Sequence, residues 1–241
     1  MFAVDDKLRS HFVPVLAAVR AAAMPQQLPQ HAPPATRRFV TISRQTGAGG
    51  VTLGEGLARR MNELFPRGPA WTCWERELVE KVARDHHLSR QVIEAMEESH
   101  PTWLSDLFSG LSIGSGADDF AVYQRVAATI RALAHGGNVA IVGRGGVFIT
   151  RKLPGGVHLR LVAPLQYRIE QIAQRLQLSG RKAAAYVERA DEARAAFYRF
   201  YWPQEPLAAE SFTMTLNTAA IGEQQLVDCV VPLLKHEVAH G

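Results

Sequence analysis

An apolar run, a glycine-rich turn and a helical stretch follow one another at residues 39–61, and this succession restricts the fold more than any other part of the sequence. Phe39–Ser43 predicts a buried strand, Gly47–Gly50 a tight turn and Leu53–Asn62 a helix. Glycines let successive backbone N–H groups point at one anion, and the helix N-terminus adds partial positive charge. The succession predicts a phosphate-binding loop, although a turn between strand and helix also uses glycine for steric reasons alone.

The loop departs from the common pattern G-x-x-x-x-G-K-[ST], in which the lysine neutralises the outer phosphates and the hydroxyl reaches magnesium. When the pattern is aligned on the turn, Arg44 replaces its first glycine and Gly50 replaces its lysine. Thr52 lies one position after the hydroxyl of the pattern. We expect the phosphates of a nucleotide to bind six consecutive residues: Gly47, Ala48, Gly49, Gly50, Val51 and Thr52.

Composition narrows the classes of function. The net charge of +4 and the pI near 9.3 suit nucleic acid, acidic lipids or small polyphosphates. The arginines are dispersed without a dense basic run, which disfavours nucleic acid and favours a small phosphate ligand. No apolar run approaches the roughly 20 residues of a membrane-spanning helix, so we expect a cytoplasmic protein with no membrane partner. Cys73 and Cys229 lack the spacing of a disulfide framework or a zinc site.

Apolar runs of strand length alternate with longer helical stretches after residue 37. The expected strands are 39–43, 70–74, 138–143, 157–162 and 212–217. The expected helices are 53–62, 75–86, 91–99, 120–135, 165–178, 182–200 and 222–235. This alternation predicts an α/β fold, a three-layer α/β/α sandwich with a mostly parallel sheet. We place the domain at 38–241, preceded over 1–37 by an N-terminal helix and a proline-rich tether.

A second motif, Val142-Gly143-Arg144-Gly145-Gly146, follows an expected strand, and ligands of open α/β sheets gather at that edge. Together with the first loop it belongs to a series of segments whose order resembles that of the cytidylate kinase-like family. The series consists of Ile42–Gly50, Glu75–Leu78, Val142–Gly146, Leu161–Pro164, Asp191–Arg194 and Leu216–Thr218. The resemblance covers about residues 38–235, and its strength lies in order and spacing.

The resemblance implies a P-loop, nucleoside monophosphate kinase-like fold, with an acceptor-binding insertion at about 75–135 and a lid at about 179–203. It also implies transfer of the terminal phosphoryl group of ATP to CMP, dCMP or a related small acceptor, with ATP and Mg²⁺ bound and Thr52 as the metal-binding side chain. Two residues are implied to act on the transferring phosphoryl group, Arg189 and Arg194, and we expect Arg44 to act with them on the chemical grounds given below. Three more are implied to bind the acceptor: Glu75, Arg144 and Asp191.

Arg44 also has a role suggested by its chemistry, because a guanidinium gives two parallel hydrogen bonds to phosphate and could offset the missing lysine. Other interpretations stay open. Arg44 could form an ion pair with Glu75 at the sheet edge, Arg144 could be a surface charge, and the arginines of the 182–200 helix could line a solvated face with ion pairs along it.

Two departures leave the function itself open. Gly145 stands where cytidylate kinases carry an Asp after the arginine, which puts specificity for cytosine in doubt, and Gly50 removes the loop lysine. A nucleotide-binding regulator that has lost efficient catalysis is therefore a second hypothesis. A dinucleotide oxidoreductase fits poorly, because Thr52 replaces the third glycine of its G-x-G-x-x-G fingerprint.

Overall fold

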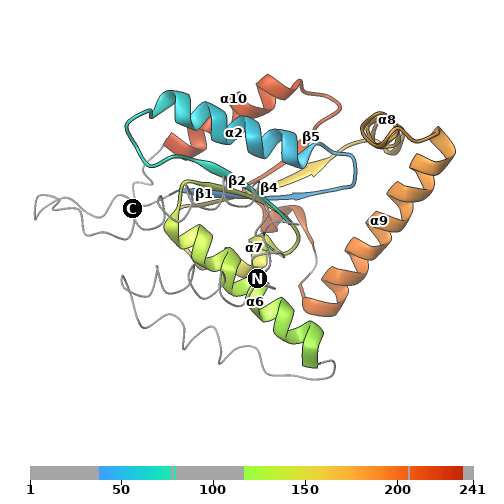
Figure 1. The fold of residues 1–241 in the computed structure, drawn as a ribbon, viewed down its shortest axis with the longest axis horizontal. Helices are drawn as coiled ribbons and strands as arrows, with labels where there is room; N and C mark the ends of the chain where they lie inside the picture. The colour runs from blue at the N-terminus through green and yellow to red at the C-terminus, as the bar shows by residue number, and fades with distance from the viewer. Residues whose placement is uncertain (1–37, 77–78, 80–116, 206, 236–241) are drawn as a thin grey trace, which may run out of the picture.

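A computed structural model describes residues 38–76, 79, 117–205 and 207–235 of the chain. The predicted helix and tether over 1–37 lie outside the described residues. The same holds for the predicted helix at 91–99 and for most of the helix at 75–86, which carry much of the predicted acceptor-binding insertion. The described remainder forms one layered unit (Figure 1).

The described residues contain a five-stranded sheet in which every pair of neighbouring strands is parallel. Its strands are β1 (Phe39–Arg44), β2 (Thr72–Glu75), β3 (Val139–Val142), β4 (Gly156–Val162) and β5 (Met214–Asn217). They lie in the order β2-β3-β1-β4-β5, so β1 is central. Ile42 of β1 stands in register with Val142 on one side and Leu159 on the other. Because all strands run the same way, their carboxyl ends meet at one edge.

Helices cover both faces of this sheet (Figure 1). α2 (Gly50–Leu64) and α10 (Glu223–Lys235) pack together on one face, and α6 (Ala117–Gly136) and α7 (Gly146–Thr150) lie on the other. α8 (Leu165–Leu176) and α9 (Gly180–Tyr201) pack on each other beside the carboxyl edge, and a short 3-10 turn, η1 (Ala209–Ser211), precedes β5. The predicted three-layer α/β fold is confirmed.

The central strand is buried on both faces, as expected of a parallel sheet between two helical layers. On the face of α2 and α10, Ile42 and Leu159 pack with Leu57, and both leucines are fully buried. On the face of α6, Phe39 packs with Leu133. Each such side chain contributes about 1.5–3 kcal/mol of hydrophobic stabilisation, so the sheet gives the loops at its edge a rigid base.

Several predicted boundaries are wrong by a few residues. α2 begins at Gly50 instead of Leu53, because Gly49 takes up the left-handed turn with φ of 73° and the helix starts directly after it. β5 begins at Met214 and not at residue 212, since Phe212 caps the end of η1 and its N–H donates to the carbonyl of Ala209. The five-residue α7 lies in a glycine-rich stretch with no helical period and was not predicted. None of the described helices combines the length and apolarity needed to cross a membrane.

Candidate active site

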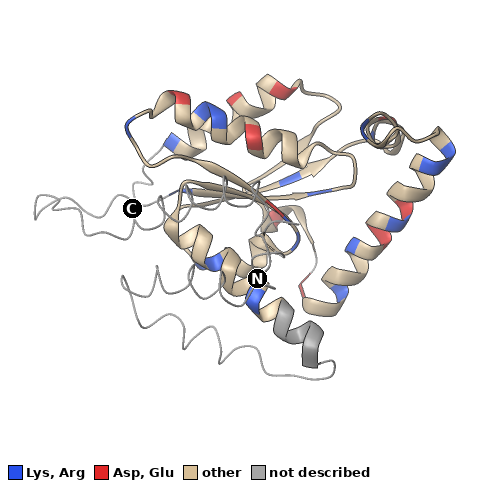
Figure 2. Ribbon diagram, in the orientation of Figure 1, with Lys and Arg blue, Asp and Glu red and all other residues tan. Residues whose placement is uncertain are grey.

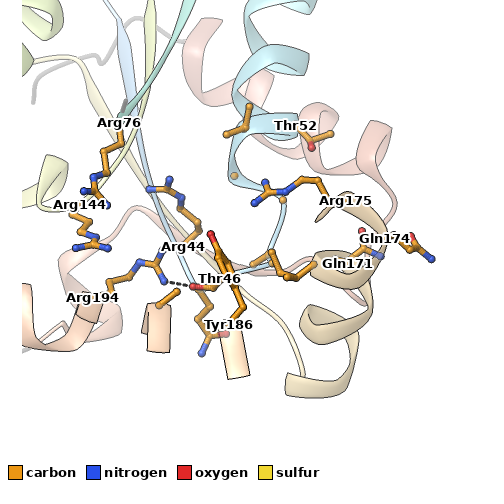
Figure 3. Close-up of a pocket in the computed structure, with 18 residues that line it drawn as sticks. Arg44, Thr46, Thr52, Arg76, Arg144, Gln171, Gln174, Arg175, Tyr186 and Arg194 are labelled. Atoms are coloured by element: carbon orange, nitrogen blue, oxygen red, sulfur yellow. Dashed lines mark hydrogen bonds between the residues drawn. The ribbon is translucent and has the colours of Figure 1, made fainter. Parts of the chain in front are cut away.

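A cavity of about 520 Å³ lies at the carboxyl edge of the sheet (Figure 3). Its lining comes from the loop after β1, the residues that follow β2 and β3, and helices α8 and α9. The chain passes from β1 to the edge strand β2, returns to β3 and then crosses to β4, so the strand order reverses beside β1. Open α/β sheets bind ligands at such a reversal.

Arginine dominates this cavity. Its lining includes Arg44, Arg76, Arg144, Arg175 and Arg194. Among the described residues that line it there is no Asp or Glu. Figure 3 shows Arg44, Arg76, Arg144 and Arg194 gathered on one side, whereas Arg175 lies on the other side with Thr52 and Gln171. Several like charges around one hollow create a strongly positive potential, which attracts a multiply charged anion. We call the four-arginine side the arginine cluster.

The glycine-rich loop makes a tight turn between β1 and α2 and borders the cavity. Residues 47–52, all predicted to bind phosphate, line the cavity. Gly47 and Gly49 have φ of 84° and 73°, in the left-handed region that favours glycine. A Cβ on Gly47 would also lie 2.5 Å from the carbonyl oxygen of Arg168. The loop therefore requires glycine at 47 for two independent reasons, one of conformation and one of space.

The missing lysine and the extra arginine of the loop have one structural explanation. A Cβ on Gly50 would lie 3.1 Å from both Cγ and Cδ of Arg44, and 3.2 Å from Cγ1 of Val142. The aliphatic part of Arg44 thus crowds the place where a side chain at residue 50 would begin. A lysine at 50 would require Arg44 or Val142 to shift by a few tenths of an ångström, so the two departures from the common pattern are linked by this contact.

Arg194 of α9 reaches the same loop. One of its terminal nitrogens, Nη1, donates to Oγ1 of Thr46 at 2.8 Å and to Oδ1 of Asp191 at 2.8 Å. Its side chain is 16% exposed, and its Nε is buried with no hydrogen-bond partner among the described residues. Burial lowers the pKa of Arg194, an effect that Asp191 opposes and the neighbouring Arg76 and Arg168 reinforce. An anion bound against Nε would satisfy this nitrogen.

Asp191 lies behind the cavity and is absent from its lining. Its carboxylate accepts hydrogen bonds from the backbone N–H of Thr46 at 2.9 Å and from Arg168 at 2.5 Å, besides that from Arg194. Burial alone would raise the pKa of Asp191, but the hydrogen bonds from Thr46 and Arg168 outweigh it and the pKa is lowered. Asp191 is therefore an ionised group that holds other parts of the site.

The structure does not bring two other predicted residues to the cavity lining. Glu75 ends β2, and the next residue, Arg76, is the one that lines the cavity. Arg189 is exposed on α9, where its Nε donates to the carbonyl of Ala185 at 3.2 Å. Basic and acidic residues are interspersed along α9 (Figure 2), as the alternative of a solvated helix face predicts, yet Arg194 points into the site. The predicted roles of Glu75 and Arg189 stay predictions, as does motion of α9 as a lid.

Aromatic side chains of α9 support the loop after β3, which carries Arg144. The guanidinium carbon of Arg144 lies 5.5 Å from the ring centroid of Phe197, and the N–H of Gly145 donates to the hydroxyl of Tyr198 at 3.1 Å. Gly145 has φ of 72°, and a Cβ on it would lie 2.2 Å from Cη2 of Trp202. The indole of Trp202 thus leaves no room for the Asp that cytidylate kinases carry at this position.

Sequence reasoning missed Arg76, Arg168 and Arg175. Arg76 lies two residues after the expected strand 70–74, so the rule that identified Arg144 at the end of its strand could have identified it as well. Arg168 and Arg175 lie within α8, whose sequence shows no motif. Their positions depend on how α8 packs against the loop, and this packing cannot be predicted from the local sequence.

A second cavity, of about 560 Å³, lies on the other side of the glycine-rich loop. The two cavities share Gly47, Ala48, Gly49, Thr52 and Gln171. The second is also lined by Tyr167 of α8 and by Thr218 and Ile221 after β5. The loop therefore separates a basic compartment from one that combines apolar and polar groups.

Comparisons with known proteins give the family of the chain and a protein of similar fold. A profile of the cytidylate kinase-like family matches residues 39–220. A solved structure of an uncharacterized protein from Eubacterium ventriosum ATCC 27560 is similar in fold, with a TM-score of 0.59, 15% identity, and coverage of 83% of this chain and 100% of that one.

A curated relative, the uronate isomerase of Corynebacterium glutamicum, is 26% identical over 147 residues. The match covers 56% of this chain and 27% of the relative, so the chain spans about a quarter of the length of that protein. The family match, which covers most of the described residues, is the broader of the two sequence similarities.

Proposed function

The chain belongs to the cytidylate kinase-like family, and on that premise we propose that it transfers the terminal phosphoryl group of ATP to a small phosphorylated acceptor such as CMP or dCMP. The observation that carries the proposal is the arginine cluster beside the glycine-rich loop, in a cavity whose described lining holds no carboxylate. Such a site suits two phosphate-bearing molecules, since both donor and acceptor bring negative charge.

Phosphoryl transfer asks little covalent chemistry of a protein. It requires the reactants in line and positive charge around a group whose negative charge is spread over three oxygens. Arg44 packs against Gly50 and Arg194 donates to the hydroxyl of Thr46, so these two arginines would bind the group in transfer. Arg76 and Arg144 follow neighbouring strands and would bind the phosphate of the acceptor. Burial strengthens each of these interactions, because the dielectric of the cavity is below that of water.

The donor nucleotide would lie along the loop. Backbone N–H groups of residues 47–52 would bind its phosphates, and the second cavity, with Tyr167 and Ile221, offers apolar surface for its base. The residues present also fit a magnesium ion held chiefly by phosphate oxygens. Thr52 supplies a hydroxyl at both cavities, while the described residues contain no group of three His, Cys, Asp or Glu side chains that could hold the ion themselves. Magnesium, when bound, neutralises charge that develops on the donor phosphates.

The alternative is a nucleotide-binding regulator of the same fold. Two observations favour it: residue 50 has no lysine, and no described carboxylate in the arginine-lined cavity is available to position a metal. The regulator and the kinase share the binding site and differ only in turnover.

A coupled phosphotransfer assay tests the proposal. The purified protein is supplied with ATP and magnesium and with CMP, dCMP, UMP, AMP or a non-nucleotide acceptor. Turnover with a nucleoside monophosphate supports the kinase. Saturable ATP binding without turnover on any acceptor supports the regulator and contradicts the kinase.

A further inference from the structure

We infer that Asp191 and Arg168 form a positioning pair, which fixes the Thr46 amide and the Arg194 side chain beside the phosphate-binding loop without touching either substrate. The inference deepens the proposed function and rests on it only where turnover is measured. It replaces the role of acceptor ligand that the sequence suggested for Asp191 with one that follows from the contacts of its carboxylate.

Arg168 joins three separate segments. Its Nε donates to the carbonyl of Ala163 at 3.0 Å, just past the end of β4. Its Nη1 donates to the carbonyl of Thr46 at 3.2 Å and to Oδ2 of Asp191 at 2.5 Å. The side chain of Arg168 is only 8% exposed, so its guanidinium forms these hydrogen bonds with protein groups and not with water. The end of β4, the loop after β1 and helix α9 are thereby fixed to one guanidinium.

Asp191 completes the arrangement from the other side. Its Oδ1 accepts from the Thr46 N–H at 2.9 Å and from Nη1 of Arg194 at 2.8 Å, and the same Nη1 donates to the Thr46 hydroxyl at 2.8 Å. Thr46, Asp191 and Arg194 therefore form a closed triangle of hydrogen bonds. Within that triangle Nε of Arg194 is the nitrogen with no partner among the described residues.

This geometry is poorly suited to binding an acceptor. Both oxygens of Asp191 are engaged by protein donors, and the residue is not part of the cavity lining. A carboxylate turned toward the cavity would also repel the phosphates that the arginine cluster attracts. In its observed place the negative charge of Asp191 balances Arg168 and Arg194, and the pair orders the loop before a ligand arrives.

Hydrogen exchange of the backbone tests the positioning pair without requiring activity. The Thr46 N–H is held by a charged acceptor, and weakening such a bond raises exchange by about tenfold or more when opening of the loop is local. We expect exchange in a peptide covering 44–52 to accelerate by about this factor in Asp191→Asn and in Arg168→Lys. The control is Glu192→Gln, which makes the same change of charge at an exposed position one residue along α9.

A peptide covering 39–43 in β1 serves as the check on folding, since it should exchange as slowly in each variant as in the unsubstituted protein. Accelerated exchange confined to the loop supports the pair. Exchange at 44–52 equal to that of Glu192→Gln, with β1 still protected, would overturn it. If Asp191→Asn fails to fold, Arg168→Lys gives the same decision, because lysine retains the charge but cannot reach Ala163, Thr46 and Asp191 together.

Steady-state kinetics separate positioning from binding. If Asp191 positions Arg194, Asp191→Asn lowers kcat by about tenfold or more while KM for the acceptor changes less than about twofold. Arg194→Met and Asp191→Asn combined should then cost little more than Arg194→Met alone, because both act through one group. A raised acceptor KM with unchanged kcat, or additive losses, would assign Asp191 to the acceptor instead. Absence of turnover in the unsubstituted protein would contradict the proposed kinase, while the exchange experiment would still decide the positioning pair.

Discussion

Gly49 and Gly145 occupy equivalent places in two neighbouring loops and have opposite surroundings. Each follows an interior strand of the sheet, β1 or β3, precedes the N-terminus of a helix and has a left-handed backbone, with φ of 73° and 72°. A Cβ on Gly49 would meet nothing within 4 Å, whereas one on Gly145 would lie 2.2 Å from Trp202. The same backbone device therefore serves two purposes: the first loop leaves space for a ligand, and the second is filled by aromatic side chains that support Arg144.

The largest expected effect tests whether the first loop carries the chemistry. Arg44→Met keeps the aliphatic stem over Gly50 but removes the charge, so kcat should fall by about 10³-fold, the scale on which arginines act in phosphoryl transfer, with little loss of stability. The measurement is the phosphotransfer assay with ATP and CMP. Arg60→Met, which removes an exposed arginine paired with Glu63 on α2, is the control and should retain full activity. Equal activity in the two variants would refute the role of Arg44.

The second prediction concerns stability, for which the second loop should be the more sensitive of the two. Gly145→Ala combines left-handed strain with a collision against Trp202 and should destabilise the protein by about 2–4 kcal/mol. Gly49→Ala adds only the strain, about 1–2 kcal/mol. Urea unfolding gives both values. The double variant Gly145→Ala/Trp202→Ala should lose less than the sum of its single variants, since the collision is absent, and strict additivity would show that the indole does not fill this space.

A third prediction concerns His158 of β4 and Thr41 of β1, the latter next to Gly146 at the start of α7. Burial lowers the pKa of His158 to about 4, and its Nδ1 lies 2.8 Å from the hydroxyl of Thr41, against which Gly146 packs. Because this pKa is below the ordinary value near 6.5, the folded state binds fewer protons than the unfolded state at mildly acidic pH. Stability should therefore be complete above about pH 6.5 and fall as the pH decreases toward 4.

Unfolding in urea between pH 7 and 4.5 measures the slope. His158→Gln should flatten the part of the slope that His158 contributes, and an unchanged slope would assign the loss of stability to other groups. Thr41→Val, which removes the hydroxyl but not the histidine, is the matched variant and should retain the slope.

The smallest expected effect lies at the margin of the second loop. Arg151 follows α7 and forms an exposed, bidentate ion pair with Glu205. Exposed pairs contribute about 0–1 kcal/mol, so Arg151→Met should change the free energy of unfolding by less than about 1 kcal/mol and leave kcat unchanged. A loss of several kcal/mol would show that the second loop depends on this surface contact more than on the aromatic side chains that support it.

The sequence predicted the first loop better than the second for a physical reason. Strand, glycine turn and helix are local patterns, so residues 47–52 and the cavity they line could be expected from the order of residue types alone. The environment of Gly145 depends on Trp202, which lies far along the chain, and the hydrogen bonds of Arg168 depend on the packing of α8. Tertiary contacts of this kind leave no periodic signal, which is why the sequence shows neither Arg168 nor the hydrogen bonds of Asp191.

Isothermal titration with inorganic tripolyphosphate tests the central claim most directly, namely that guanidinium groups from separate segments converge on an anion held by the glycine-rich loop. The account predicts saturable binding that is weakened at least tenfold by Arg194→Met and by Arg44→Met, and hardly changed by Arg60→Met. Equal affinity in all four proteins would contradict it.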